Sequence, residues 1–177
     1  MSDYAASHAP KTVRLERLLP GPIDRVWAFL TDADKRKRWF AGGDMAESGA
    51  FNLFFQHRNI TDEPGPERFK TAIEGFDSPC EMVRWDPPRS LAFSWGGDTG
   101  ASLVTWELFE KGADVLFVIT HTELPNRDEM VDVSGGWHAH TDILEAVLRG
   151  TKPMPFWANI AELEKYYGAL YPQNAAG

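Results

Sequence analysis

Three histidines in apolar surroundings are the strongest candidates for chemistry in this sequence. His57 and His121 end segments in which every second residue is apolar, and His140 follows Trp137 at a spacing that places both on one face of a helix. Imidazole titrates near neutral pH, so each histidine could act as a general acid or base, or anchor a ligand. A hydrogen-bonded structural histidine is the alternative at each position. We take His121 and His140 as the candidate catalytic residues.

No other pattern in the sequence supports catalysis. GxSxG, P-loop and GxGxxG motifs are missing, as are paired carboxylates at predicted inward positions. The histidines lack the HxH spacing on a strand or the HxxxH spacing on a helix that is typical of zinc sites, so we expect no metal and no cofactor. His138 precedes Asp142 by four residues, which is typical of a solvated helix pair.

Alternation along the predicted strands collects a large apolar and aromatic area on one face. A solid core is the alternative for any single side chain, but for the set we predict a ligand cavity, because sites for small apolar molecules are concave and lined by such groups. Trp39 is expected at the rim, and Arg58 and Arg68 could meet an acidic ligand at the mouth. The predicted ligand-binding residues are Trp39, Phe51, Leu53, Phe55, His57, Phe93, Trp95, Val104, Trp106, Phe117, Ile119, His121, Trp137, His140, Thr141 and Leu144.

Composition limits the class of protein. The chain has 177 residues, of which 43% are hydrophobic and 12% aromatic, which is enough for one core. The net charge is −8, and the longest basic run, residues 35–38, is expected to form a solvated helix face, so we expect no nucleic-acid partner. No apolar run is long enough for a membrane span or forms a signal core before Lys11. Cys80 is the single cysteine, which favours a reducing compartment, and we expect a cytoplasmic protein.

The hydrophobic period changes along the chain and indicates the elements that position these residues. Strand patterns occur at 12–19, 50–57, 80–85, 90–95, 101–110 and 113–122, and their close spacing favours an antiparallel sheet. Helical patterns occur at 23–30, at 31–40, from Gly135-Gly136 to Gly150, and at 155–167. We expect a flexible tail at 1–10, one domain at 11–150 with a long irregular connection at 58–79, and an appended helix within 151–177 that packs on the same domain.

Four segments resemble START-like (SRPBCC) proteins of the group of heat-shock-protein-90 ATPase activator homologues, and they occur in the family's order. They are ERLLPGPIDRVWAFLTDADKRKRWF, CEMVRWDPPRSLAFSW, VTWELFEKGADVLFVITHTEL and GGWHAHTDILEAVLRG. The resemblance covers residues 11–150 and implies the helix-grip fold. In this α+β fold a curved antiparallel sheet wraps around a long C-terminal helix, two short helices follow the first strand, and a cavity lies between helix and sheet.

The resemblance leaves three functions open, because the family includes bacterial ligand-binding domains, polyketide cyclases, lipid carriers and a co-chaperone. Our leading hypothesis is a monomer or homodimer that binds a small hydrophobic or amphipathic molecule between sheet and helix. The second is a cyclase, dehydratase or hydrolase of an aromatic or polyketide-like substrate, with His121 or His140 as general acid or base. The third is a chaperone-regulating interaction module.

Overall fold

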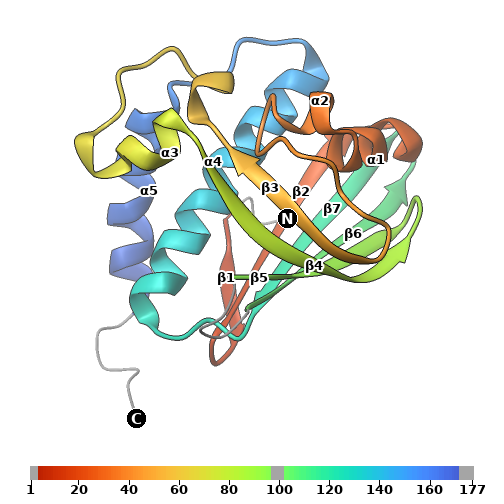
Figure 1. Ribbon diagram of the computed structural model, residues 1–177, viewed down its shortest axis with the longest axis horizontal. Coiled ribbons are helices and arrows are strands. Elements are labelled where there is room, and N and C mark those ends of the chain that lie inside the picture. The colour runs from red at the N-terminus through yellow and green to blue at the C-terminus, as the bar shows by residue number, and fades with distance from the viewer. Residues whose placement is uncertain (1–3, 97–101, 172–177) are drawn as a thin grey trace.

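A seven-stranded antiparallel sheet packs against two long helices in the computed structural model, which describes residues 4–96 and 102–171 (Figure 1). The strands are β1 (Ala6–Ala9), β2 (Thr12–Pro20), β3 (Gly49–Phe55), β4 (Phe76–Asp86), β5 (Ser90–Trp95), β6 (Ser102–Lys111) and β7 (Asp114–Thr122). The helices are α1 (Ile23–Thr31), α2 (Ala33–Arg36), α3 (Lys70–Glu74), α4 (Arg127–Arg149) and α5 (Phe156–Leu170), with short 3-10 turns η1 (His57–Asn59) and η2 (Glu67–Phe69).

The strand order is β1-β2-β7-β6-β5-β4-β3, so β1 and β3 lie at opposite edges of the sheet. Strands β3 to β7 follow one another as a meander, and β2 then pairs with β7. In β2 the side chains of Val13, Leu15 and Leu19 are buried and alternate with half-buried ones, as the predicted period of two requires. Helix α4 crosses the concave side of the sheet, with α5 beside it (Figure 1). This is the predicted α+β helix-grip fold.

Helix α4 begins about two turns earlier than we predicted. The side chain of Asn126 accepts a hydrogen bond from the backbone N–H of Glu129, and this cap starts the helix at Arg127. Gly150 ends it in the left-handed conformation, with a φ of 68°. The pair Gly135-Gly136 therefore lies inside the helix rather than at its start, because the cap and the packing of α4 outweigh the low helix propensity of glycine.

Part of the segment that we predicted as a flexible tail forms a strand. Residues Ala6–Ala9 form β1, which pairs with β2, and the backbone N–H of Ala5 donates to the hydroxyl of Tyr167 over 2.8 Å. The open edge of β2 offers backbone donors and acceptors, and this segment satisfies them. The predicted connection at 58–79 is also shorter than expected, because β4 already begins at Phe76.

Arg36 contradicts the prediction that residues 35–38 form a solvated face. Its side chain is fully buried, and its guanidinium donates to the carbonyl oxygens of Ala41 at 3.0 Å and Thr31 at 2.9 Å and to that of Gly43. A planar guanidinium has five N–H donors on three nitrogens and can satisfy carbonyls on several sides at once, whereas the three donors of a lysine share one nitrogen. Burial lowers the pKa of Arg36 to about 10, so it stays charged at neutral pH.

Aromatic rings fill the space between the sheet and α4. Trp39, Trp106, Phe93 and Phe117 are fully buried, and the Trp106 ring centroid lies 5.8, 5.4 and 6.0 Å from those of the other three. Side chains in protein interiors interdigitate at this kind of spacing and leave few voids. We expected Trp39 at the rim of an open cavity, but it is a core residue. Aromatic rings occupy the middle of the space between the sheet and α4.

We expect Arg36→Ala to lower the free energy of unfolding by at least about 3 kcal/mol, because several buried carbonyls lose a charged donor. Lys35→Ala is the matched control, since the Lys35 side chain is 43% exposed and a surface pair with Asp32 contributes less than about 1 kcal/mol. Urea unfolding followed by tryptophan fluorescence measures both. Equal losses in the two variants would contradict the structural role of Arg36.

Candidate functional site

A pocket of about 270 Å³ lies where the ends of three strands meet α4, α5 and the connection between β3 and β4. We call it the histidine pocket, because two histidines are the polar groups in its buried part. Its lining residues are Phe55, Phe76 and Trp95 from the strands, His57, Arg68, Phe69 and Ala72 from the connection, Asp132, Gly135, Gly136 and His140 from α4, and Phe156, Trp157, Ile160 and Glu164 from α5. Aromatic walls with a few polar atoms are typical of small-molecule sites.

His57 and His140 are held in the same tautomer by backbone carbonyls. Nδ1 of His57 lies 3.0 Å from the carbonyl oxygen of Ala72, and Nδ1 of His140 lies 2.7 Å from that of Trp39. A carbonyl oxygen only accepts, so each Nδ1 carries the hydrogen and each Nε2 carries a lone pair. Among the described residues, no group hydrogen-bonds either Nε2 atom. The ring centroids of His57 and His140 are 5.3 Å apart, so both acceptors belong to one small part of the pocket.

Burial keeps both rings neutral. His140 is 6% exposed, and burial lowers its pKa to about 3, with the adjacent His57 adding to the shift. Burial also lowers the pKa of His57. At neutral pH the two side chains are therefore hydrogen-bond acceptors at Nε2 rather than cations or acids.

Two glycines of α4 leave open space on that side of the pocket, because they have no side chains. Asp132, Gly136 and His140 are spaced by four residues and form one stripe along the helix. A Cβ added to Gly136 would meet no atom within 4 Å, and one added to Gly135 would meet only Leu163 Cβ, at 3.7 Å. Glycine in a helix interior costs about 1 kcal/mol relative to alanine. The helix is thus less stable here, and the space in front of it stays open.

The connection and α5 cover the pocket together. The carboxylate of Glu63 accepts a hydrogen bond of 3.0 Å from the backbone N–H of Trp157, one of the unpaired donors in the first turn of α5. The ring of Phe69 stacks on that of Trp157 at 5.1 Å. A Cβ on Gly65 would lie 2.8 Å from the Trp157 indole and 2.3 Å from Ile73, so only glycine allows this close approach. In Figure 1, α3 accordingly lies over the upper end of α5.

Charged side chains surround the mouth of the pocket. Arg68 pairs with Glu164 over 2.7 Å, and Asp132 lies on the α4 side. Partial burial, helped by the negative charges of Glu129 and Glu164, raises the pKa of Asp132. Arg68 is thus engaged by a carboxylate of its own chain, which argues against the acidic ligand considered from the sequence.

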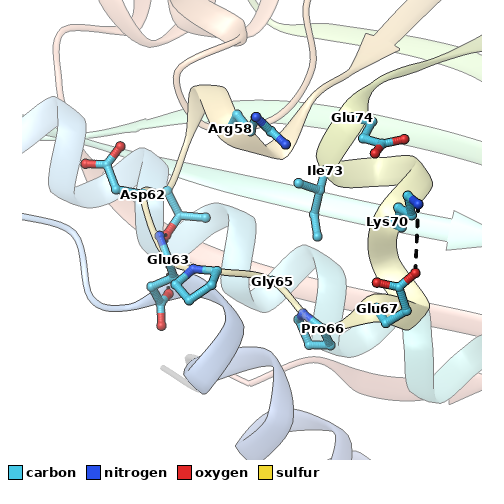
Figure 2. Close-up of a pocket in the computed structure, with 11 residues that line it drawn as sticks. Arg58, Asp62, Glu63, Gly65, Pro66, Glu67, Lys70, Ile73 and Glu74 are labelled. Carbon is cyan, nitrogen blue, oxygen red and sulfur yellow. Dashed lines mark hydrogen bonds and ion pairs between the residues drawn. The ribbon is translucent and has the colours of Figure 1, made fainter.

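A second, larger hollow of about 540 Å³ lies within the connection itself (Figure 2). Its lining is polar, with Arg58, Asp62, Glu67 and Lys70 among the charged members, and Lys70 is 4.0 Å from Glu67. None of its lining residues is aromatic. The histidine pocket is the better candidate, because it alone of the two joins aromatic walls to buried polar atoms.

His121 is buried in the core, and both of its ring nitrogens are engaged. The indole Nε1 of Trp137 donates to Nδ1 of His121 over 3.2 Å, so Nε2 carries the hydrogen and donates to the hydroxyl of Ser102 over 2.7 Å. That hydroxyl donates in turn to the carbonyl of Trp95, at 2.9 Å. Burial lowers the pKa of His121 to about 4. This geometry favours the structural alternative for His121.

The structure separates the predicted ligand-binding residues into two groups. Phe55, His57, Trp95 and His140 line the histidine pocket. The others are buried in the core and do not line it, namely Trp39, Phe51, Leu53, Phe93, Val104, Trp106, Phe117, Ile119, His121, Trp137, Thr141 and Leu144. The period of the strands identifies inward-facing side chains, but whether they meet or leave a space depends on their volumes across the core.

Sequence reasoning missed the residues that the connection, α5 and the first part of α4 contribute. Phe69, Phe156 and Trp157 belong to segments that we described as irregular or appended. Their aromatic content was a usable signal, because a solvated loop or a free tail has no need of such rings. Asp132 was missed because α4 was expected to begin after it.

His138 and Asp142 are not the solvated pair that we expected. His138 is buried, with Nδ1 3.0 Å from the Tyr167 hydroxyl and Nε2 3.6 Å from the Asp142 carboxylate. The same carboxylate pairs with Arg17 of β2 at 2.8 Å and accepts a hydrogen bond of 2.9 Å from Asn159 of α5. This polar network joins α4 to α5 and to the sheet, which explains why α5 packs on α4.

The helix-grip fold with a pocket beside its long helix defines a START-like (SRPBCC) protein, a fold of the ligand-binding or cyclase type. The family model described as activator of Hsp90 ATPase homolog 1-like protein matches residues 20–149, and the chain belongs to this family. Helix α5 lies outside the matched part.

Solved structures agree with this assignment. A protein of Bordetella parapertussis, solved by NMR, is 41% identical, with 98% of this chain and 95% of that chain covered and a TM-score of 0.81. CalU16 of Micromonospora echinospora is 25% identical over 90% of this chain and 87% of that chain, with a TM-score of 0.66. DynU16, from the dynemicin biosynthetic locus, shares the fold at 19% identity over 82% of this chain and 49% of that chain, with a TM-score of 0.63. No curated protein matches the sequence.

Within 4–96 and 102–171, no helix is long and apolar enough to cross a membrane. In the same ranges, no group of three or more His, Cys, Asp or Glu side chains could hold a metal ion.

Filling the pocket from α4 should remove binding without harming the fold. We expect Gly136→Leu to leave the free energy of unfolding unchanged or raise it by about 0.5–1 kcal/mol, because a helix glycine is replaced and its Cβ has open space. Binding of an apolar fluorescent probe should be lost. Gly168→Leu, in α5 and equally unobstructed, is the control and should keep the probe. If the Gly136→Leu variant still binds the probe, then the probe binds outside the histidine pocket.

Mild acid should destabilise the protein before most carboxylates titrate. The folded-state pKa values of about 3 for His140 and about 4 for His121 lie below the 6.5 of an unfolded histidine. The unfolded state therefore binds protons first. The contribution of each histidine is present above pH 6.5 and is lost as the pH falls from 6.5 toward its folded-state pKa, by up to about 1.4 kcal/mol per pH unit for each histidine. Urea midpoints between pH 7.5 and about 5 measure this slope. His140→Gln, which keeps a donor for the Trp39 carbonyl, should reduce the slope, and an unchanged slope would contradict the assignment.

Proposed function

We propose that the protein binds a small aromatic molecule with a hydrogen-bond donor in the histidine pocket. The observation that carries this proposal is the pair of neutral, buried histidines whose Nε2 atoms have no partner among the described residues and which line an aromatic pocket. Neither Nε2 atom is cut off from the open space of the pocket, so a donor on a ligand can reach it, and such a hydrogen bond contributes about 0.5–1.5 kcal/mol to binding. A hydroxyl or an amine N–H has the required chemistry.

The size of the pocket restricts the ligand. Its volume of about 270 Å³ is just below the range of roughly 300–1,000 Å³ for sites of drug-sized molecules. One or two rings fit such a volume, and a long acyl chain or a polycyclic skeleton does not. Membership of a START-like family supports a ligand-binding role in general, while the pocket supports this narrower class.

The second hypothesis, acid–base catalysis by a cavity histidine, has less support. A general base works best with a pKa near the working pH. Burial lowers the pKa of His140 to about 3 and that of His121 to about 4. Such groups take up a proton poorly at neutral pH and cannot donate one, whereas a neutral Nε2 acceptor suits binding.

A pair of matched probes tests the proposal. 4-Ethylphenol should bind in a saturable way and about tenfold more tightly than 4-ethylanisole, which has the same ring but no O–H donor. His57→Phe and His140→Phe should each reduce that preference, and the double variant should remove most of it, because one hydroxyl can donate to either Nε2. Isothermal calorimetry or an NMR titration of the folded variants provides the affinities.

His121→Phe is the control, because it changes a buried histidine whose nitrogens are both engaged inside the core. It should lower stability and leave the preference for 4-ethylphenol intact. If neither probe binds, or both bind equally, the proposed function fails.

A further inference from the structure

We propose that the histidine pocket selects cationic over anionic ligands, so that its ligand class is an arylalkylamine whose ring enters the pocket and whose ammonium group stays at the mouth beside Asp132. This inference rests on the proposed function, because it requires that the pocket accept a ring. It adds the sign of the ligand's charge and identifies Asp132 as the residue that recognises this charge.

The charges at the mouth favour a cation. Asp132 and Glu164 face one guanidinium, that of Arg68, and Arg68 is already paired with Glu164 at 2.7 Å. Asp132 lies within the influence of Glu129 and Asp128 from its own helix and of Glu164 and Arg68 from the facing segments. Asp128 is paired with Arg127 over 3.0 Å, which leaves Glu129, Asp132 and Glu164 against Arg68. Carboxylates still outnumber cations, so an ammonium group lowers the local electrostatic energy and a carboxylate raises it.

The interior of the pocket offers acceptors where an anion would need donors. His57 and His140 each use the hydrogen on Nδ1 for a backbone carbonyl and present only the lone pair of Nε2. The Nε1 hydrogen of Trp95 is also engaged, by the hydroxyl of Ser78 at 2.8 Å. A carboxylate that lost its water here would regain few hydrogen bonds, which is costly for a charged group.

The aromatic walls add to the preference for a cation. The faces of aromatic rings attract cations when the charge lies within about 6 Å of the ring centroid. The structure already contains this contact at the mouth, where the guanidinium carbon of Arg68 lies 4.4 Å from the centroid of Phe69. Trp157, which stacks on Phe69 at 5.1 Å, extends the same surface inward.

The geometry of α4 allows one short ligand to meet both ends of the pocket. Asp132, Gly136 and His140 lie on one helical stripe, and eight residues correspond to a rise of about 12 Å. Asp132 is exposed at the mouth, and His140 is buried at the inner end. A ligand with a donor at one end, a ring in the middle and an ammonium group at the other end matches this order.

Three probes with the same ring separate the two proposals. They are 4-ethylphenol, which is neutral, tyramine, which carries an ammonium group, and 3-(4-hydroxyphenyl)propionate, which carries a carboxylate. At low salt we expect tyramine to bind at least about fivefold more tightly than the carboxylate, with 4-ethylphenol between them. Raising the salt concentration should reduce the difference, because the mouth is open to solvent.

Asp132→Asn should bring the affinities for tyramine and the carboxylate severalfold closer. Asp34→Asn, which removes the same charge from an 87% exposed side chain outside the pocket, should leave their ratio unchanged. If 4-ethylphenol binds but the two charged probes bind equally, or the carboxylate binds more tightly, the inference is wrong and the proposed function stands. If none of the three binds, the proposed function fails and this inference fails with it.

Discussion

The buried hydrogen bond from Nδ1 of His140 to the carbonyl oxygen of Trp39, 2.7 Å long, is the contact on which both the packing and the site depend. It ties α4 to the segment after α2, and Trp39 extends the tie to α1 through its indole N–H, which donates to the carbonyl of Phe29 over 2.8 Å. Buried polar groups need partners, so this bond cannot be lost without a penalty. The same bond sets the tautomer of His140, and a structural contact thereby determines the chemistry at the inner end of the pocket.

The pocket exists because the aromatic core stops short of one end of the sheet and two other segments cover the remaining space. These two segments are α5 and the connection between β3 and β4, and each of them alone would leave groups without partners. The first turn of α5 has unpaired N–H groups, and Glu63 of the connection accepts one of them. The connection has few apolar partners of its own, and Trp157 of α5 provides one for Phe69. The family match ends at residue 149, so the site combines the family's fold with a helix outside the matched part.

Local signals in the sequence predicted much of the fold. The alternation in β2 and the cap of α2 by Asp32, which accepts a hydrogen bond of 3.0 Å from the backbone N–H of Lys35, follow from residues close together in the chain. The errors have a different origin. Arg36 sits in a run of four basic residues, and nothing nearby distinguishes it from Lys35. Its burial depends on carbonyls of Thr31, Ala41 and Gly43 that converge only after α1, α2 and the following segment have packed.

The sequence by itself indicated the antiparallel strands, the helices, and His57 and His140 as polar groups on apolar faces, because strand and helix periods are local properties of the chain. The resemblance of four segments to START-like proteins then implied the helix-grip fold. Only the tertiary structure decided that His121 is engaged inside the core while His140 lines a pocket. It also decided that the open space lies along the N-terminal half of α4, from Asp132 to His140. The physical reason is that a void, a tautomer and a shifted pKa each depend on the volumes and hydrogen-bond partners that distant segments bring together, and no local pattern encodes them.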